Sequence, residues 1–175
     1  MRVLLLCLDM DPFSEQGDKH TGAAHLYVQE TIQMYNDKNV ELLAVTRWNS
    51  IEKLERFSYK ENSKLVRLKI GEISYEGKEY LWGREDTSLA KVVELLEKED
   101  FSPDIVHAVY WYSGKIALAL LEKYHFRFVY TPISLGKVKH SLTKAISPHD
   151  QDREETEQRI FDSSDLILSV CLQER

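Results

Sequence analysis

The sequence predicts an α/β fold: a Rossmann-like open, mostly parallel sheet with helices on both faces. The first observation behind this prediction is the repeated alternation of short apolar, β-prone runs with longer amphipathic segments. The second is the composition, because 43% of the 175 residues are hydrophobic. That share is enough to build the core of a single domain spanning residues 1–175.

The first third of the chain contains a strand, a loop, a helix and a second strand. Residues 2–8 are a continuous β-prone run, as expected for a strand buried on both faces, and 9–20 are rich in loop-forming residues. Apolar positions recur near every 3.6 residues over 22–37, which predicts a helix, and 40–46 form the next strand. This order is the βαβ unit of a parallel sheet.

The remaining elements are less regular in the middle of the chain and regular again after Pro103. In order, the sequence predicts a partly helical segment at 48–60, a half-exposed strand at 64–70, a hairpin or mobile aromatic loop at 71–83, a helix at 87–98, a strand at 104–108, a helix at 113–124, a strand at 127–131, a polar basic loop at 132–148, a charged helix at 153–161 and a strand at 165–170. The sheet should therefore have five or six strands with right-handed crossovers. Because Arg175 follows the last strand so closely, we expect a domain boundary there.

Charge and hydropathy exclude some classes of function. A net charge of −6 argues against a general nucleic-acid binder, which needs a basic face. No stretch approaches the ~18 apolar residues of a membrane span. Acidic residues follow the apolar N-terminal run where a signal peptide needs small ones, so we expect a cytoplasmic protein.

Cys7 and Cys171 lack metal-like spacing and are expected to be buried and reduced.

Ligands of open α/β sheets bind beyond the carboxyl ends of the strands. The loops expected at that edge are 9–22, 107–114, 131–139 and 171–175. In the first of them, the backbone amides of Gly22 and Ala23 open the predicted helix and could face a ligand, with ordinary capping as the alternative.

Three residues near the second loop are candidates for contact with a sugar. His107 could hydrogen-bond hydroxyl groups or carry a proton in catalysis, although a packed core histidine is the alternative. Tyr110 and Trp111 could stack on a sugar ring, or could instead anchor the helix that follows.

The third loop combines cations with an amide in an acidic protein. Lys137 and Lys139 lie beside Ser134 and Gly136, and an exposed glycine amide next to two cations suits a phosphate or another anion. A solvated surface loop is the alternative.

Signatures of other enzyme classes are missing from the sequence. It has no GxSxG, HExxH or CxxC motif, and no glycine-rich fingerprint follows the first strand, which argues against a nucleotide binder of the NAD or ATP type. Asp9 and Asp11 could bind a divalent cation, but no third acidic ligand is near, so no metal site is expected.

Several segments, in order, resemble the N-terminal domain of the retaining glycosyltransferase family that includes sucrose-phosphate synthases and sucrose synthases (glycosyltransferase family 4). TGAAHLYVQE resembles that family's Gly-Gly loop running into a Tyr-Val-x-Glu-Leu helix. PDIVHAVYWYSG resembles its Pro-Asp-hydrophobic-hydrophobic-His-Ala-His-Tyr-Trp-x-x-Gly motif. The other matches are residues 40–47, which resemble a strand ending in Val-x-Thr-Arg, 131–139, which resemble Thr-Gly-His-Ser-Leu-Gly-Arg-x-Lys, and 159–174, which resemble Arg-Ile-x-x-Ala-Asp-x-Ile-x-x-Ser closing on Gln-Glu.

This resemblance implies a GT-B architecture in which the present domain binds a small-molecule sugar acceptor. A C-terminal domain, in cis or in trans, would bind the nucleotide-sugar donor, and transfer would retain the anomeric configuration without a cofactor or an obligatory metal. The family's donor-binding residues are not in this chain, so the isolated domain is expected to show little or no transfer.

Four positions depart from the family pattern. Ala23 replaces the second loop glycine, and Val109 and Ile133 replace histidines. Lys137 stands where the sucrose-phosphate synthase pattern has an arginine associated with the acceptor phosphate, which keeps the charge but loses bidentate geometry. These departures leave two interpretations: an enzyme with a divergent acceptor, or a non-catalytic binding or scaffolding module that needs a partner subunit.

Overall fold

The computed structural model describes residues 1–13, 23–73, 78–142 and 148–170. Its strands form one seven-stranded sheet in the order β3-β4-β2-β1-β5-β6-β7. These strands are β1 (Arg2–Leu6), β2 (Glu41–Arg47), β3 (Arg56–Lys60), β4 (Ser63–Leu68), β5 (Ile105–Val109), β6 (Arg127–Thr131) and β7 (Leu166–Ile167). Only the β3–β4 pair is antiparallel among the described pairs, so the predicted open, mostly parallel sheet is confirmed.

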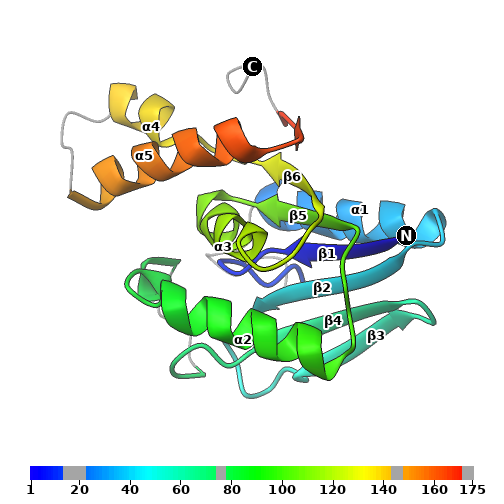
Figure 1. Cartoon of the computed structure of the whole chain (residues 1–175). Helices are drawn as coiled ribbons and strands as arrows, with labels where there is room; N and C mark the ends of the chain where they lie inside the picture. Colours follow the sequence, from blue (N-terminus) through cyan, green and yellow to red (C-terminus); the bar gives the residue numbers. More distant parts are fainter. Residues whose placement is uncertain (14–22, 74–77, 143–147, 171–175) are drawn as a thin grey trace.

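Helices cover both faces of this sheet (Figure 1). They are α1 (Ala23–Asp37), the short 3-10 helix η1 (Lys78–Leu81), α2 (Glu85–Lys98), α3 (Trp111–Leu121), α4 (Gly136–Leu142) and α5 (Pro148–Ser163). Helix α1 packs on one face, while α2 and α3 pack on the other and α5 packs against α3. Within the described ranges, none of these helices has the length and apolar character to cross a membrane.

Strand β1 lies at the centre of the sheet and divides the core in two. Leu4 and Leu6 point into the cluster beneath α2 and α3, whereas Val3 and Leu5 point into the cluster beneath α1. All four side chains are fully buried. This is why the N-terminal run is continuously apolar instead of alternating with polar residues.

Three local predictions are wrong, and in the first two cases pairing or packing with a distant segment decides the outcome. Residues 56–60 of the segment expected to be partly helical form β3, because they pair with β4 as a hairpin at the sheet edge. The expected loop 132–148 contains α4, which packs on α5. The last strand is reduced to the two exposed residues of β7. Of the aromatic segment 71–83, residues 78–81 form η1, and 74–77 lie outside the described residues.

Gly114 determines how closely α3 approaches α5. A Cβ atom at this position would lie 2.5 Å from Ile160 Cδ1 and 3.2 Å from Tyr130 Cε2, and both of those side chains are fully buried. We therefore expect Gly114→Ala to lower the free energy of unfolding by about 1–3 kcal/mol through overpacking. Alanine ordinarily stabilises a helix relative to glycine by about 1 kcal/mol. The two effects on the free energy of unfolding therefore have opposite signs, and urea denaturation shows which one dominates. A variant more stable than the wild type would contradict the packing argument.

Candidate functional site

The carboxyl ends of β1, β2, β5 and β6 meet at one edge of the sheet because these strands are parallel. Two residues that follow β5 and β6 at this edge have a positive φ. Tyr110 has φ 71° and ψ 157°, a region occupied almost only by glycine, and the β-branched Ile133 has φ 61°. Backbone strain of this kind gathers at functional sites, so this edge is the candidate site.

Arg153 of α5 joins two of the predicted loops. Its Nη2 donates to the carbonyl oxygen of Ser134 at 2.7 Å and to the Ser134 hydroxyl at 3.2 Å. Its Nη1 donates to the Tyr110 hydroxyl at 3.3 Å, and the guanidinium carbon lies 5.0 Å from the centre of the Tyr110 ring. One buried cation therefore connects the loop after β5 with the loop after β6.

A carboxylate already occupies the glycine amide that was expected to be exposed. Gly136 is buried, and its N–H donates to Glu157 Oε2 at 2.8 Å, while Glu157 Oε1 accepts from Arg153 Nε at 2.7 Å. Burial raises the pKa of Glu157, and Arg153 and the Gly136 amide oppose that rise. The prediction of an exposed Gly136 amide is thus wrong, because α5 covers it.

The polar side chains of the same loop remain at the surface. Ser134, Lys137 and Lys139 are all exposed, the last two on α4. Ser134 is contacted by Arg153, and the two lysines follow it in the chain. Because Lys137 and Lys139 are two residues apart on a helix, their side chains point to different sides. Their role in binding stays a prediction.

His107 lies inside the protein and is 1% exposed. Its Nδ1 is 3.1 Å from the Tyr35 hydroxyl, and its Nε2 is 2.9 Å from the Thr131 hydroxyl, which in turn lies 3.0 Å from the Tyr27 hydroxyl. Burial lowers the pKa of His107 to about 4, so the imidazole is neutral at pH 7. This chain of hydrogen bonds ties α1 to β5 and β6. Both ring nitrogens are occupied, so His107 has the surroundings of a packed core histidine.

The aromatic residues after β5 are also buried. Trp111 is 3% exposed, with ring centroids 6.5 Å from Trp82 and 6.0 Å from Tyr112. Tyr110 is 6% exposed and contacts Trp111 edge-on. Their packing is that of an anchor for α3. Stacking of either ring on a sugar stays a prediction.

The first predicted loop is only partly described. Gly22 lies outside the described residues, and Ala23 is the first residue of α1. Of the two cysteines, Cys7 is a free thiol that is fully buried, as expected, and burial raises its pKa, whereas Cys171 lies outside the described residues.

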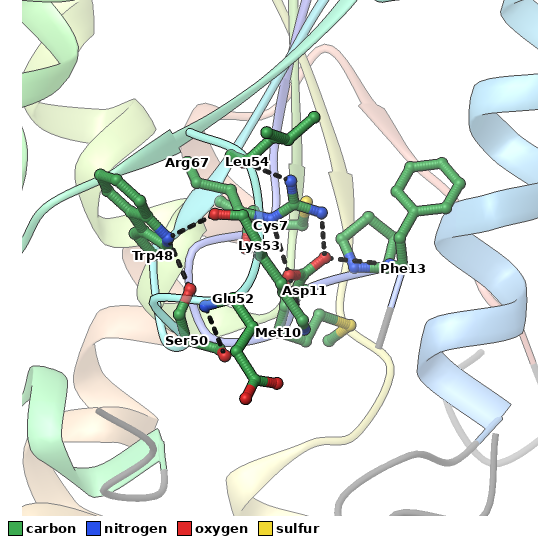
Figure 2. A network of polar contacts seen from close by, with 12 residues as sticks. Cys7, Met10, Asp11, Phe13, Trp48, Ser50, Glu52, Lys53, Leu54 and Arg67 are labelled. Atoms are coloured by element: carbon green, nitrogen blue, oxygen red, sulfur yellow. Dashed lines mark hydrogen bonds and ion pairs between the residues drawn. The ribbon is translucent and has the colours of Figure 1, made fainter. Parts of the chain in front are cut away.

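A buried ion cluster holds together three segments at the same edge (Figure 2). The carboxylate of Asp11, whose side chain is fully buried, accepts hydrogen bonds from Arg67 Nε at 2.8 Å and from Lys53 Nζ at 2.9 Å. Arg67 Nη1 also donates to the Leu54 carbonyl at 2.7 Å, which fastens the segment between β2 and β3. Burial alone would raise the pKa of Asp11, but the two cations lower it overall.

The Asp11 carboxylate, which the sequence offered as a possible ligand for a divalent cation, is instead paired with two cations. Across the part of the chain that the structure describes, no group of three His, Cys, Asp or Glu side chains is placed to hold a metal ion.

Three residues of this edge were not found from the sequence: Arg153, Glu157 and Arg67. A signal existed for the first two, since an Arg and a Glu four residues apart face the same side of a helix. That signal is weak because such pairs are usually exposed and stabilise only the helix itself. No sequence pattern pointed to Arg67, because its partner Asp11 is distant in the sequence.

Curated relatives match almost the whole chain but only part of their own length. The D-inositol 3-phosphate glycosyltransferase of Corynebacterium glutamicum is 25% identical over 177 residues, covering 99% of this chain and 42% of the relative. The protein of the same name from Actinosynnema mirum is 26% identical, with 96% and 41% covered. The chain therefore spans about two fifths of the length of these relatives. No protein-family model matches it.

Solved structures give the same picture of the fold. Sucrose-phosphate synthase from Thermosynechococcus elongatus superposes with a TM-score of 0.87 at 21% identity, covering 99% of this chain and 43% of that one. The catalytic domain of starch synthase IV from Arabidopsis thaliana gives a TM-score of 0.63 at 11% identity, with 95% and 44% covered. The predicted N-terminal GT-B domain fold is thereby confirmed.

Proposed function

We propose that this chain, which is homologous over almost its whole length to the N-terminal portion of GT-B glycosyltransferases, forms the acceptor-binding side of a retaining enzyme. In this proposal the enzyme transfers a sugar from a nucleotide-sugar to a small acceptor. The donor is bound by a second domain, supplied in cis or in trans. Since an acceptor hydroxyl attacks the anomeric carbon while the diphosphate departs, stabilising the departing charge falls to that second domain.

The acceptor that we propose carries a phosphate group. The observations that carry this proposal are the exposed hydroxyl-bearing Ser134, which Arg153 contacts, and the exposed Lys137 in the first turn of α4 that follows it. Guanidinium and ammonium groups are the usual partners of phosphate oxygens, and serine hydroxyls add further donors. Two of the relatives' names fit this choice: one acts on D-inositol 3-phosphate and another is a sucrose-phosphate synthase.

Within this proposal His107 supports the site instead of touching the sugar. Its burial keeps it from direct contact, and its bond to Thr131 fixes the end of β6, from which the loop carrying Ser134 begins. Loss of the imidazole would then act on the acceptor loop through Thr131.

A non-catalytic binding or scaffolding module is the second candidate. The observation that favours it is the apolar lining of this edge: Val109 is fully buried, and Ile133 packs against the same core cluster. Histidines at these positions in the related family could hydrogen-bond a ligand, whereas valine and isoleucine cannot.

Lys137 allows a direct test of the proposed acceptor. In the protein joined to or mixed with its donor-binding domain, we expect Lys137→Ala to raise KM for D-inositol 3-phosphate about tenfold, with kcat nearly unchanged. The reason is that a contact to the acceptor phosphate is equally strong before and during transfer. Both constants are obtained from initial rates at varied concentrations of D-inositol 3-phosphate, with a panel of nucleotide-sugars tested as donors.

Lys123→Ala is the matched control, because Lys123 is also exposed but lies beyond the C-terminal end of α3, at the opposite edge of the sheet. Equal effects of the two substitutions would contradict the proposed acceptor site. If the protein with its donor domain turned over none of the nucleotide-sugars, the enzymatic proposal would fail and the scaffolding module would take its place.

A further inference from the structure

One carboxylate of α5 holds two parts of the candidate site at once. Glu157 Oε2 accepts the Gly136 N–H at 2.8 Å, and Oε1 accepts Arg153 Nε at 2.7 Å. Glu157 is 3% exposed and Arg153 is 5% exposed. There is little spare room around this contact, since a Cβ atom at Gly136 would lie 3.2 Å from Glu157 Oε2 and 3.3 Å from Arg153 Nε.

This contact determines where the Arg153 guanidinium points. A guanidinium is planar and rigid, so fixing Nε also fixes the directions of both Nη groups. With Nε bound to Glu157, Nη2 reaches Ser134 and Nη1 reaches Tyr110. The loop after β6 is held twice, at Ser134 by Arg153 and at Gly136 by Glu157.

We propose that Glu157 is a positioning residue: it sets the orientation of Arg153 and of the loop at 134–136, and through them the affinity of the site for a phosphate group. Glu157 itself does not touch the ligand. This inference rests on the proposed function, since it specifies how the phosphate-binding part of the acceptor site is organised.

The sign of the effect separates positioning from simple electrostatics. If Glu157 acted only through its charge, the site would bind an anion more tightly once that negative charge next to Arg153 was removed. If Glu157 positions the site, removing it weakens anion binding although the protein becomes less negative. A variant that keeps the charge but shortens the side chain should weaken binding as well.

The experiment compares Glu157→Gln and Glu157→Asp with the wild-type protein, using inorganic phosphate and D-inositol 3-phosphate as probes in calorimetric titrations. We expect both variants to bind roughly tenfold more weakly, an effect comparable to that of outer-shell partners at metal sites. Glu155→Gln is the control, because it removes the same charge from an exposed position on the same helix. It should bind phosphate as the wild type does, or slightly more tightly. Tighter binding by Glu157→Gln would overturn the proposal.

A second readout does not depend on the ligand. In NMR spectra of the protein without ligand, Glu157→Asp should shift the amide of Gly136 and the Nε–H signal of Arg153, whereas Glu155→Gln should shift neither. Unchanged signals in Glu157→Asp would also overturn the proposal, even if Glu157→Gln failed to fold. If the wild type bound neither probe, the proposed phosphate-bearing acceptor would fail, and these NMR shifts would decide the role of Glu157 by themselves.

Discussion

Replacing Asp11 with asparagine is expected to lower the free energy of unfolding by about 3–5 kcal/mol, because it removes one partner of a buried ion pair. The Arg67 side chain is only 6% exposed, so its charge cannot recover solvation when the carboxylate is lost. Lys53, at 23% exposure, can turn partly to water. Most of the cost therefore comes from Arg67. Chemical denaturation at pH 7 measures it.

The exposed pair of Lys60 and Asp37 supplies the control for this prediction. Asp37 and Lys60 are about half exposed, so Asp37→Asn should cost less than about 1 kcal/mol. The double variant Asp11→Asn/Arg67→Met should be less destabilised than the sum of the two single variants, since the stranded charge is removed as well. Similar costs for Asp11→Asn and Asp37→Asn would show that the cluster contributes no more than a surface pair.

The second large effect is a loss of stability on mild acidification, caused by His107. Its pKa is about 4 in the folded protein and 6.5 when exposed, so the unfolded chain takes up a proton first as the pH falls. The contribution of His107 to the free energy of unfolding is therefore fully present above about pH 6.5. It decreases as the pH falls toward 4, by roughly 3 kcal/mol for a shift of this size. Denaturant titrations at pH steps between 7 and 4 measure this decrease.

Two variants isolate the contribution of His107 from that of other titrating groups. His107→Gln should cost about 1–3 kcal/mol at pH 7, because the hydroxyls of Tyr35 and Thr131 lose partners, but it should remove most of the pH dependence. His125→Gln changes an exposed imidazole and should keep the wild-type profile. The stabilisation from the lowered pKa of Asp11 is lost as the pH falls from about the ordinary value of 3.8 downward, which is below most of the His107 range, and it is the same in both variants. Parallel profiles for wild type and His107→Gln would refute the assignment.

The local sequence pattern was sufficient to predict those elements in which it reflects which residues are buried and which are exposed. Strand β1 was predicted because both of its faces are covered, so every residue from Val3 to Leu6 is apolar. Helix α2 was predicted because one of its sides faces the core and the other faces water. In such elements the environment of each residue follows from its neighbours along the chain.

The elements that were missed depend on distant partners. Strand β3 forms only because β4 offers an edge with which it can pair. Helix α4 lies in a polar segment, and its first residue is held by Glu157 of another helix. The same reason applies to the site: Lys137 and Ser134 could be read from one loop, whereas the contacts of Arg153 with Tyr110 and Ser134 require the folded chain.

The backbone of Tyr110 has a consequence for engineering this protein. Glycine at this position would remove backbone strain of about 1–3 kcal/mol. The same exchange would delete the ring and hydroxyl that Arg153 contacts. Because Tyr110 is only 6% exposed, loss of its packed ring would cost about 3–5 kcal/mol, more than the strain that glycine relieves. Directed evolution for heat resistance should therefore keep the strained tyrosine, and with it this part of the candidate site.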